Sequence, residues 1–182
     1  ILRVMQWPGV IQTESLDQDA LQATVLESLK HALADLVATR EREGAALEQM
    51  IIQRCEQIND IAEQTKTRLP EILASHRQKL SDRIAELEVN LEPERLEQEM
   101  VLLAQKADVA EEIDRLQNHV NEVKHTLKRD EPIGRRLDFL MQELNREANT
   151  LGSKSIDTDT TRYSVDLKVL IEQMREQIQN IE

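Results

Sequence analysis

Long runs of apolar residues at helical spacing, with few residues that could interrupt them, constrain this chain more than any other feature. Between positions 47 and 87, aliphatic side chains recur at intervals of three, four, seven or eight residues, which is the pattern of one helix face. The 182 residues include only four Gly and four Pro, whereas a sandwich, a barrel or a doubly wound sheet needs frequent turns. The sequence therefore predicts an all-α protein.

The core of such a protein must be aliphatic, because only Trp7, Phe139 and Tyr163 are aromatic. Narrow aliphatic seams favour long helices that cover each other in pairs. We therefore predict long antiparallel, coiled-coil-like helices with a helical bundle at the C-terminal end. The predicted domains are a helical arm region over 1–92 and a C-terminal helical domain over 93–182 that carries the functional site.

Five helical segments are predicted from the seams and from the residues between them: 21–36, 47–87, 93–127, 137–151 and 167–181. The third segment begins at Pro93, because the first turn of a helix favours proline. Gly44 precedes the second segment and Pro70 lies within it. We therefore expect a separate helix after Gly44 and a break or kink near Leu69.

A single cysteine, Cys55, excludes an intramolecular disulfide and a multi-cysteine zinc site, and it fits a reducing compartment. No run approaches the roughly 18 apolar residues of a membrane span, and no signal-peptide pattern opens the chain. We therefore expect a cytoplasmic protein with no membrane partner. The chain begins at Ile1 rather than at a methionine, so we also expect residues upstream of it.

The third segment carries charged residues beside its apolar stripe. At 100° per residue, Asp108, Glu112, Arg115 and His119 fall within a sector of about 60°. Carboxylates and an imidazole that are partly buried at this edge could ligate a divalent metal ion or transfer a proton. The alternative is a set of ordinary ion pairs along one helix, such as Glu112 with Arg115.

The fourth segment divides its polar residues into two groups. One side carries Arg135, Asp138, Gln142, Asn145, Arg146 and Asn149, whereas Arg136, Glu143 and Glu147 lie on the flank nearest the apolar stripe. Asparagine is a poor helix former, so two asparagines in this segment suggest a function. Amides, guanidinium groups and paired carboxylates suit a phosphodiester bound together with a hard metal ion. A polar contact between helices is the alternative.

The net charge of -12 opposes simple binding of nucleic acid, which depends on Lys and Arg. The charge is uneven, however. Residues 66–83 hold five basic and two acidic side chains, and residues 124–136 hold the same numbers, so each stretch has a net charge of +3. These two basic islands could contact phosphate, or they could be ordinary solvated surface. With three aromatic residues, RNA would be held through phosphate, ribose and metal rather than by base stacking.

The stretch from Gly134 to Ser155 resembles the characteristic segment of the bacterial YicC/YloC family. The end of the chain from 167 to 182 is similar to that family's C-terminus, and the stretches 95–99 and 108–112 also match its pattern. The resemblance covers the whole chain and is most specific from position 93 onward. Family members are longer at the N-terminus by a region with its own fold. The resemblance therefore implies that 1–92 comprises the end of this N-terminal region and a long helical hairpin, and that the N-terminal domain itself is absent from the chain.

This resemblance implies a metal-dependent endoribonuclease, from a family first regarded as stress-related. The expected reaction is hydrolysis of phosphodiester bonds in single-stranded or small regulatory RNA. The expected cofactor is a divalent cation, Mn²⁺ or Mg²⁺. The resemblance also favours a catalytic interpretation of the carboxylates in the third and fourth segments.

We assign the candidate residues to three roles as a hypothesis. The candidate catalytic residues are Glu112, His119, Glu143 and Glu147, with His119 as the proton-transfer group. The candidate metal ligands are Asp108, Glu111, Glu112, Asp138, Glu143 and Glu147. The candidate RNA-binding residues are Arg115, Arg135, Arg136, Asn145, Arg146, Asn149 and Lys154.

Two other functions fit the same sequence. A non-catalytic helical scaffold could bind RNA or act as an adaptor for RNA-degradation enzymes, with no metal chemistry. A pure oligomerisation module is the third possibility. Exposed aliphatic seams favour self-association, and we predict a homo-oligomer, with six as the favoured number of subunits.

Overall fold

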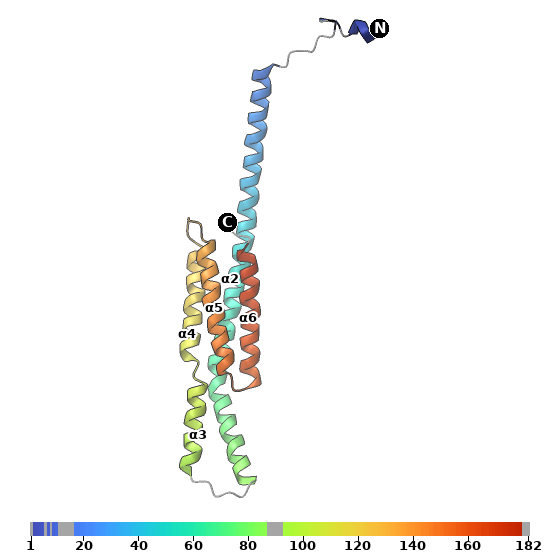
Figure 1. Cartoon of the computed structure of the whole chain (residues 1–182). Helices are drawn as coiled ribbons and strands as arrows, with labels where there is room; N and C mark the ends of the chain where they lie inside the picture. The colour runs from blue at the N-terminus through green and yellow to red at the C-terminus, as the bar shows by residue number, and fades with distance from the viewer. Residues whose placement is uncertain (1, 6, 8, 11–16, 87–92, 180–182) are drawn as a thin grey trace. The chain divides into compact units, whose positions relative to one another are not determined.

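The computed structural model describes residues 2–5, 7, 9–10, 17–86 and 93–179, and these residues are almost entirely helical (Figure 1). The helices are α1 (Leu2–Met5), α2 (Gln18–Glu86), α3 (Pro93–Lys106), α4 (Ala110–Thr126), α5 (Gly134–Lys154) and α6 (Thr158–Ile178). No strand occurs among the described residues. The predicted all-α class is therefore confirmed.

The chain divides into two compact units, 1–45 and 46–182, and the boundary falls within α2. In the first unit, α2 begins after Asp17, whose carboxylate accepts hydrogen bonds from the backbone N–H groups of Asp19 and Ala20. This is the expected helix N-cap. The aliphatic residues of this part of α2 are each about half exposed: Leu21, Val25, Leu26, Leu29, Leu33, Leu36 and Val37. Self-association through this face stays a prediction.

The second unit is built around one aliphatic core shared by α2, α4, α5 and α6, which lie side by side in Figure 1. From α2 the core takes Ile51, Cys55, Ile58 and Ala62, all fully buried. The other three helices contribute leucine, isoleucine, valine, methionine and alanine at helical spacing, so the predicted aliphatic bundle is confirmed. The second part of α2, which precedes position 93 in the sequence, is thus one of its four helices.

The predicted separate helix after Gly44 and the predicted break near Leu69 are wrong, because α2 is a single helix of 69 residues. A kink near Leu69 stays a prediction. Glycine within a helix costs only about 1 kcal/mol relative to alanine, and strong helix formers flank Gly44. A proline in a helix costs about 3 kcal/mol because it removes a hydrogen bond and crowds the preceding turn. Packing of the buried Thr65 and Ile72 on either side of Pro70 offsets this cost.

The predicted third helix is also wrong in one respect, because it is divided into α3 and α4 by residues 107–109. The carboxylate of Asp108 accepts a hydrogen bond from the backbone N–H of Ala110 at 3.2 Å, and such a bond favours the start of a new helix. Ala107 and Val109 are buried on either side. In addition, α3 lies beside the end of α2 (Figure 1), where Arg77 pairs with Glu97.

No helix of the described ranges is both long enough and apolar enough to cross a membrane.

Candidate metal-binding site between α4 and α5

The helices α4 and α5 pack together along their apolar stripes, and this packing brings the polar residues beside each stripe face to face. On α4, the stripe includes Ile113, Leu116 and Val120, all buried. On α5, it includes residues from Leu137 to Leu151 at helical spacing. We call the facing polar edge of the two helices the polar flank, formed by Glu112, Arg115, His119, Glu122, Arg136, Glu143, Glu147 and Lys154.

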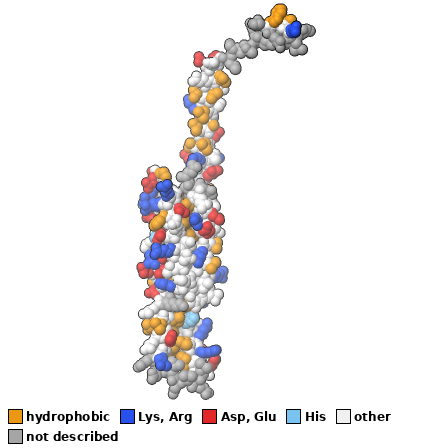
Figure 2. Space-filling model, viewed as in Figure 1, with side chains coloured by type: hydrophobic (Ala, Val, Ile, Leu, Met, Phe, Trp, Pro, Cys, Tyr) orange, Lys and Arg blue, Asp and Glu red, His pale blue; other side chains and the backbone are white. Residues whose placement is uncertain are grey.

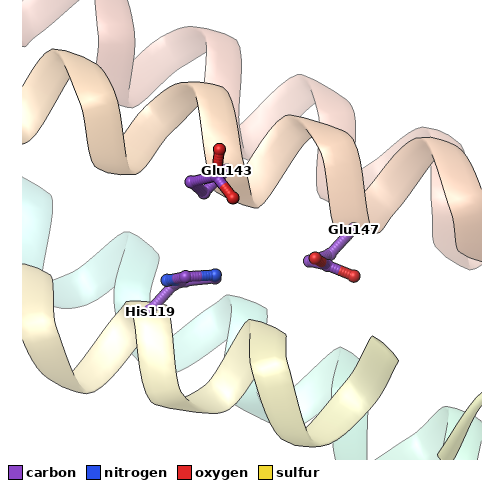
Figure 3. Close-up of side chains that lie close together, drawn as sticks. All are labelled: His119, Glu143 and Glu147. Carbon is purple, nitrogen blue, oxygen red and sulfur yellow. The ribbon is translucent and has the colours of Figure 1, made fainter. Parts of the chain in front are cut away.

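In the middle of the polar flank, His119 of α4 faces Glu143 and Glu147 of α5 (Figure 3). One ligand atom from each residue lies within 4.8 Å of the other two. The Glu147 side chain is 5% exposed, whereas His119 and Glu143 are half-buried. The three residues are therefore close enough to share one cation, and the cluster remains accessible from solvent on one side.

The two oxygens of the Glu147 carboxylate differ in their surroundings. Oε1 lies 3.0 Å from Nε of Arg115, whereas Oε2 is buried and has no hydrogen-bond partner among the described residues. A buried, unpaired carboxylate oxygen is costly, because its lost contacts with water are not replaced. A cation beside His119 and Glu143 would supply the missing partner. The donor set of two carboxylates and one imidazole therefore fits a divalent metal ion.

Arg115 connects this cluster to a second buried carboxylate, that of Glu112. The Nη2 atom of Arg115 lies 3.3 Å from Oε1 of Glu112, and the close pairing with the Glu147 carboxylate raises the pKa of the guanidinium above its usual value. Lys154 contacts Oε1 of Glu112 at 3.0 Å, and it donates a hydrogen bond to the backbone carbonyl of Asp108 at 2.7 Å. These contacts connect the start of α4 with the second half of α5 in one charged network.

Nearer the turn between the helices, the polar flank consists of exposed ion pairs. Glu122 pairs with Arg136, and Nη2 of Arg129 lies 3.7 Å from the same carboxylate. The hydrogen bond from Arg136 lowers the pKa of Glu122 below its usual range. This carboxylate is already paired with two cations, so it is a poor candidate for a metal ligand.

Comparison with known proteins shows the family to which the chain belongs. Residues 65–182 match the family described as "Endoribonuclease YicC-like, C-terminal", and residues 1–49 match "Endoribonuclease YicC-like, N-terminal region". The chain belongs to the YicC-like endoribonuclease family. All residues of the polar flank lie within the range that matches the C-terminal description.

Two curated relatives carry the name "Probable endoribonuclease YicC". The protein from Haemophilus influenzae is 49% identical over 179 residues, which cover 98% of this chain and 62% of the relative. The protein from Clostridioides difficile is 36% identical over 187 residues, which cover 100% of this chain and 64% of the relative. The chain thus spans less than two thirds of the length of these YicC-like proteins, and the predicted family resemblance is confirmed.

Of the six predicted metal ligands, the structure brings together Glu143 and Glu147, and it adds His119, which the sequence predicts for proton transfer. The remaining four carboxylates have other partners. Asp108 contacts the backbone at the start of α4, Glu111 pairs with Arg115, Glu112 pairs with Arg115 and Lys154, and Asp138 contacts Gln142 and Arg175. The structure therefore does not support Asp108, Glu111, Glu112 or Asp138 as members of this cluster.

The predicted RNA-binding residues fall into two groups. Exposed side chains on α5 are Arg135, Asn145, Arg146 and Asn149, and Nη1 of Arg146 lies 4.0 Å from Oε2 of Glu143. The other three, Arg115, Arg136 and Lys154, form ion pairs within the polar flank. Figure 2 shows basic side chains interspersed with acidic ones near the turn between the end of α4 and the start of α5, so the basic island at 124–136 is a mixed surface.

Proposed function

We propose that this chain carries the metal-binding site of an endoribonuclease that hydrolyses phosphodiester bonds in single-stranded RNA with a divalent cation. The observation that supports this proposal most strongly is the cluster of His119, Glu143 and Glu147, in which Glu147 has a buried oxygen without a hydrogen-bond partner among the described residues. Membership of the YicC-like endoribonuclease family supplies the substrate class. The names of the relatives supply the reaction type.

The donor set favours Mn²⁺ over Mg²⁺. Mg²⁺ prefers oxygen ligands and retains several waters, whereas imidazole is a better ligand for later first-row metals. When bound, such a cation lowers the pKa of a coordinated water and neutralises charge on phosphate oxygens. We now assign His119 as a metal ligand. This role replaces the proton-transfer role that the sequence predicts for this residue.

The other residues of the site would hold the ligands and the RNA in place. Arg115 fixes Glu147 through Oε1, leaving Oε2 free for a cation. This is the arrangement by which a second group orients a metal-binding carboxylate. Arg146, whose side chain is 75% exposed beside Glu143, is placed to contact a phosphate of RNA at the metal site.

Cleavage of a labelled single-stranded RNA tests this function. We expect Mn²⁺-dependent cleavage that EDTA abolishes and that Glu143→Gln lowers by at least about 100-fold, because the substitution removes a charged ligand. The matched control is Asp138→Asn, which removes one exposed carboxylate on the same helix outside the cluster, and which should retain cleavage within a few-fold. Equal activity of wild type and Glu143→Gln would contradict the assignment.

A non-catalytic RNA-binding or adaptor protein is the second candidate function. It is favoured by the ion pairs that connect α4 with α5 along the polar flank, since pairs such as Glu122 with Arg136 can stabilise a bundle without any metal. In that case, RNA would bind without being cleaved in Mn²⁺. The cleavage assay described above separates the two functions.

A further inference from the structure

Arg115 is held by three carboxylates that differ greatly in exposure. Nε contacts Glu147 at 3.0 Å and Nη2 contacts Glu112 at 3.3 Å, and the side chains of these two partners are 5% and 6% exposed. Nη1 contacts Glu111 at 2.5 Å, and the Glu111 side chain is 80% exposed. One edge of the guanidinium is therefore fixed among buried groups, while Nη1 is paired with a solvent-exposed carboxylate.

The buried partners of Arg115 are themselves fixed by the bundle. Glu112 belongs to the buried side of α4 and is contacted by Lys154 at the end of α5, and Glu147 projects from the middle of α5. Arg115 therefore has little rotamer freedom left to lose when it binds a further group. A guanidinium that is oriented in advance loses little conformational entropy when its remaining donor, Nη1, binds a phosphate oxygen.

The contact with Glu111 is easy to replace. Ion pairs between residues four apart on an exposed helix surface contribute little to stability. A carboxylate also resembles a phosphodiester in its single negative charge and two acceptor oxygens. Glu111 thus occupies the position at which a phosphate would meet Arg115, next to the cluster of His119, Glu143 and Glu147.

We propose that Arg115 binds a backbone phosphate of RNA through Nη1, and that Glu111 occupies this position when RNA is absent. This inference rests on the proposed function, because it names the group that holds the RNA next to the same metal cluster. Glu111 then acts as a competitor of the substrate. Its removal should strengthen RNA binding, in contrast to the loss expected when a binding residue is removed.

The test is the affinity of a fluorescein-labelled single-stranded RNA, measured by fluorescence anisotropy in EDTA so that no cleavage occurs. We expect Glu111→Gln to tighten binding by about twofold, since one weak, exposed ion pair no longer competes with phosphate. The matched control is Asp114→Asn, an exposed position on the same helix, which removes the same charge without removing a partner of Arg115. This control should change the affinity less than Glu111→Gln.

A second variant shows whether Arg115 mediates the effect. Arg115→Lys keeps a positive charge beside the buried carboxylates but removes the forked donors, so we expect weaker RNA binding. Glu111→Gln should then give no further gain when it is combined with Arg115→Lys, because coupled residues do not act additively. A gain that equals that of Asp114→Asn, a gain that persists in Arg115→Lys, or no RNA binding by the wild type would overturn the proposal.

These results are independent of the cleavage assay. If Glu111→Gln tightens RNA binding through Arg115 while Mn²⁺ gives no cleavage, the proposed enzymatic function fails and the role of Arg115 stands. If cleavage follows the metal ligands but the affinities of Glu111→Gln and Asp114→Asn are equal, the enzymatic function stands and the role of Arg115 fails.

Discussion

The two ends of the polar flank carry the same residue types, but their carboxylates differ in burial and in pairing. We call the end with the metal cluster the site end and the end near the turn between α4 and α5 the turn end. At the site end, Glu112 and Glu147 are buried, and each has an Oε2 atom without a hydrogen-bond partner in the described part of the chain. At the turn end, Glu122 is more exposed and is paired with Arg129 and Arg136. The comparison shows that a count of carboxylates does not identify a metal site. Burial and unfilled hydrogen-bonding capacity, together with other ligand atoms close by, distinguish Glu147, which lies beside His119 and Glu143, from the other carboxylates.

The largest expected difference between the two ends is in thermal stability. Arg115→Ala leaves two buried carboxylates without this cation, so we expect Tm to fall by about 5–10 °C. Arg136→Ala removes only exposed contacts and should lower Tm by less than about 2 °C. Circular dichroism melting curves at neutral pH without metal would measure both values. Similar shifts for the two variants would show that the ends of the polar flank do not differ in burial as described.

A smaller effect is expected in the pH dependence of the turn end. The hydrogen bond from Arg136 lowers the pKa of Glu122 from its usual value of about 4.5. A carboxylate with a lowered pKa in the folded state contributes stability above its unfolded pKa, and this contribution is lost as pH falls through the folded pKa. Urea unfolding of wild type and Glu122→Gln should therefore differ at pH 7, and the difference should disappear as the pH falls below about 4.5. A constant difference down to pH 3 would exclude this linkage.

The helices of the bundle are predictable from the sequence because aliphatic residues mark their buried faces. The same pattern does not show which of these faces are covered by another helix. In the first part of α2, Leu29 and Leu33 lie at helical spacing, as do Ile51 and Ile58 in the second part. The two leucines are about half exposed, however, and the two isoleucines are buried. Spacing defines a helix face, whereas burial depends on which other helix packs against it.

The sequence around Asp108 contains a pattern that indicates the division between α3 and α4. Asp108 is followed at positions 111 and 112 by two further acidic residues, which is typical of the start of a helix. The apolar seam continues across this point, so spacing alone predicts one helix. At the interruption itself, the backbone N–H of Ala110 donates a hydrogen bond to the carboxylate of Asp108.

The membership of the metal cluster was only partly predictable. The helix positions of Glu143 and Glu147 correctly predict the flank nearest the apolar stripe, where Glu147 is buried. The pairing with His119 requires the register between α4 and α5. His119 and Glu143 lie about equally far in sequence from the turn near Asp130, so an antiparallel hairpin brings them together. The unpaired oxygen of Glu147 depends on the position of Arg115, which no sequence pattern specifies.

The most direct test of the central claim is a calorimetric titration of Mn²⁺ into three metal-free proteins: wild type, Glu147→Gln and Glu122→Gln. The wild type and Glu122→Gln should each bind one Mn²⁺ per chain with similar affinity. Glu147→Gln should bind at least about tenfold more weakly, because it loses a charged ligand at the site end of the polar flank. Equal binding by all three proteins, or no binding by the wild type, would contradict the assignment of this cluster as a metal site.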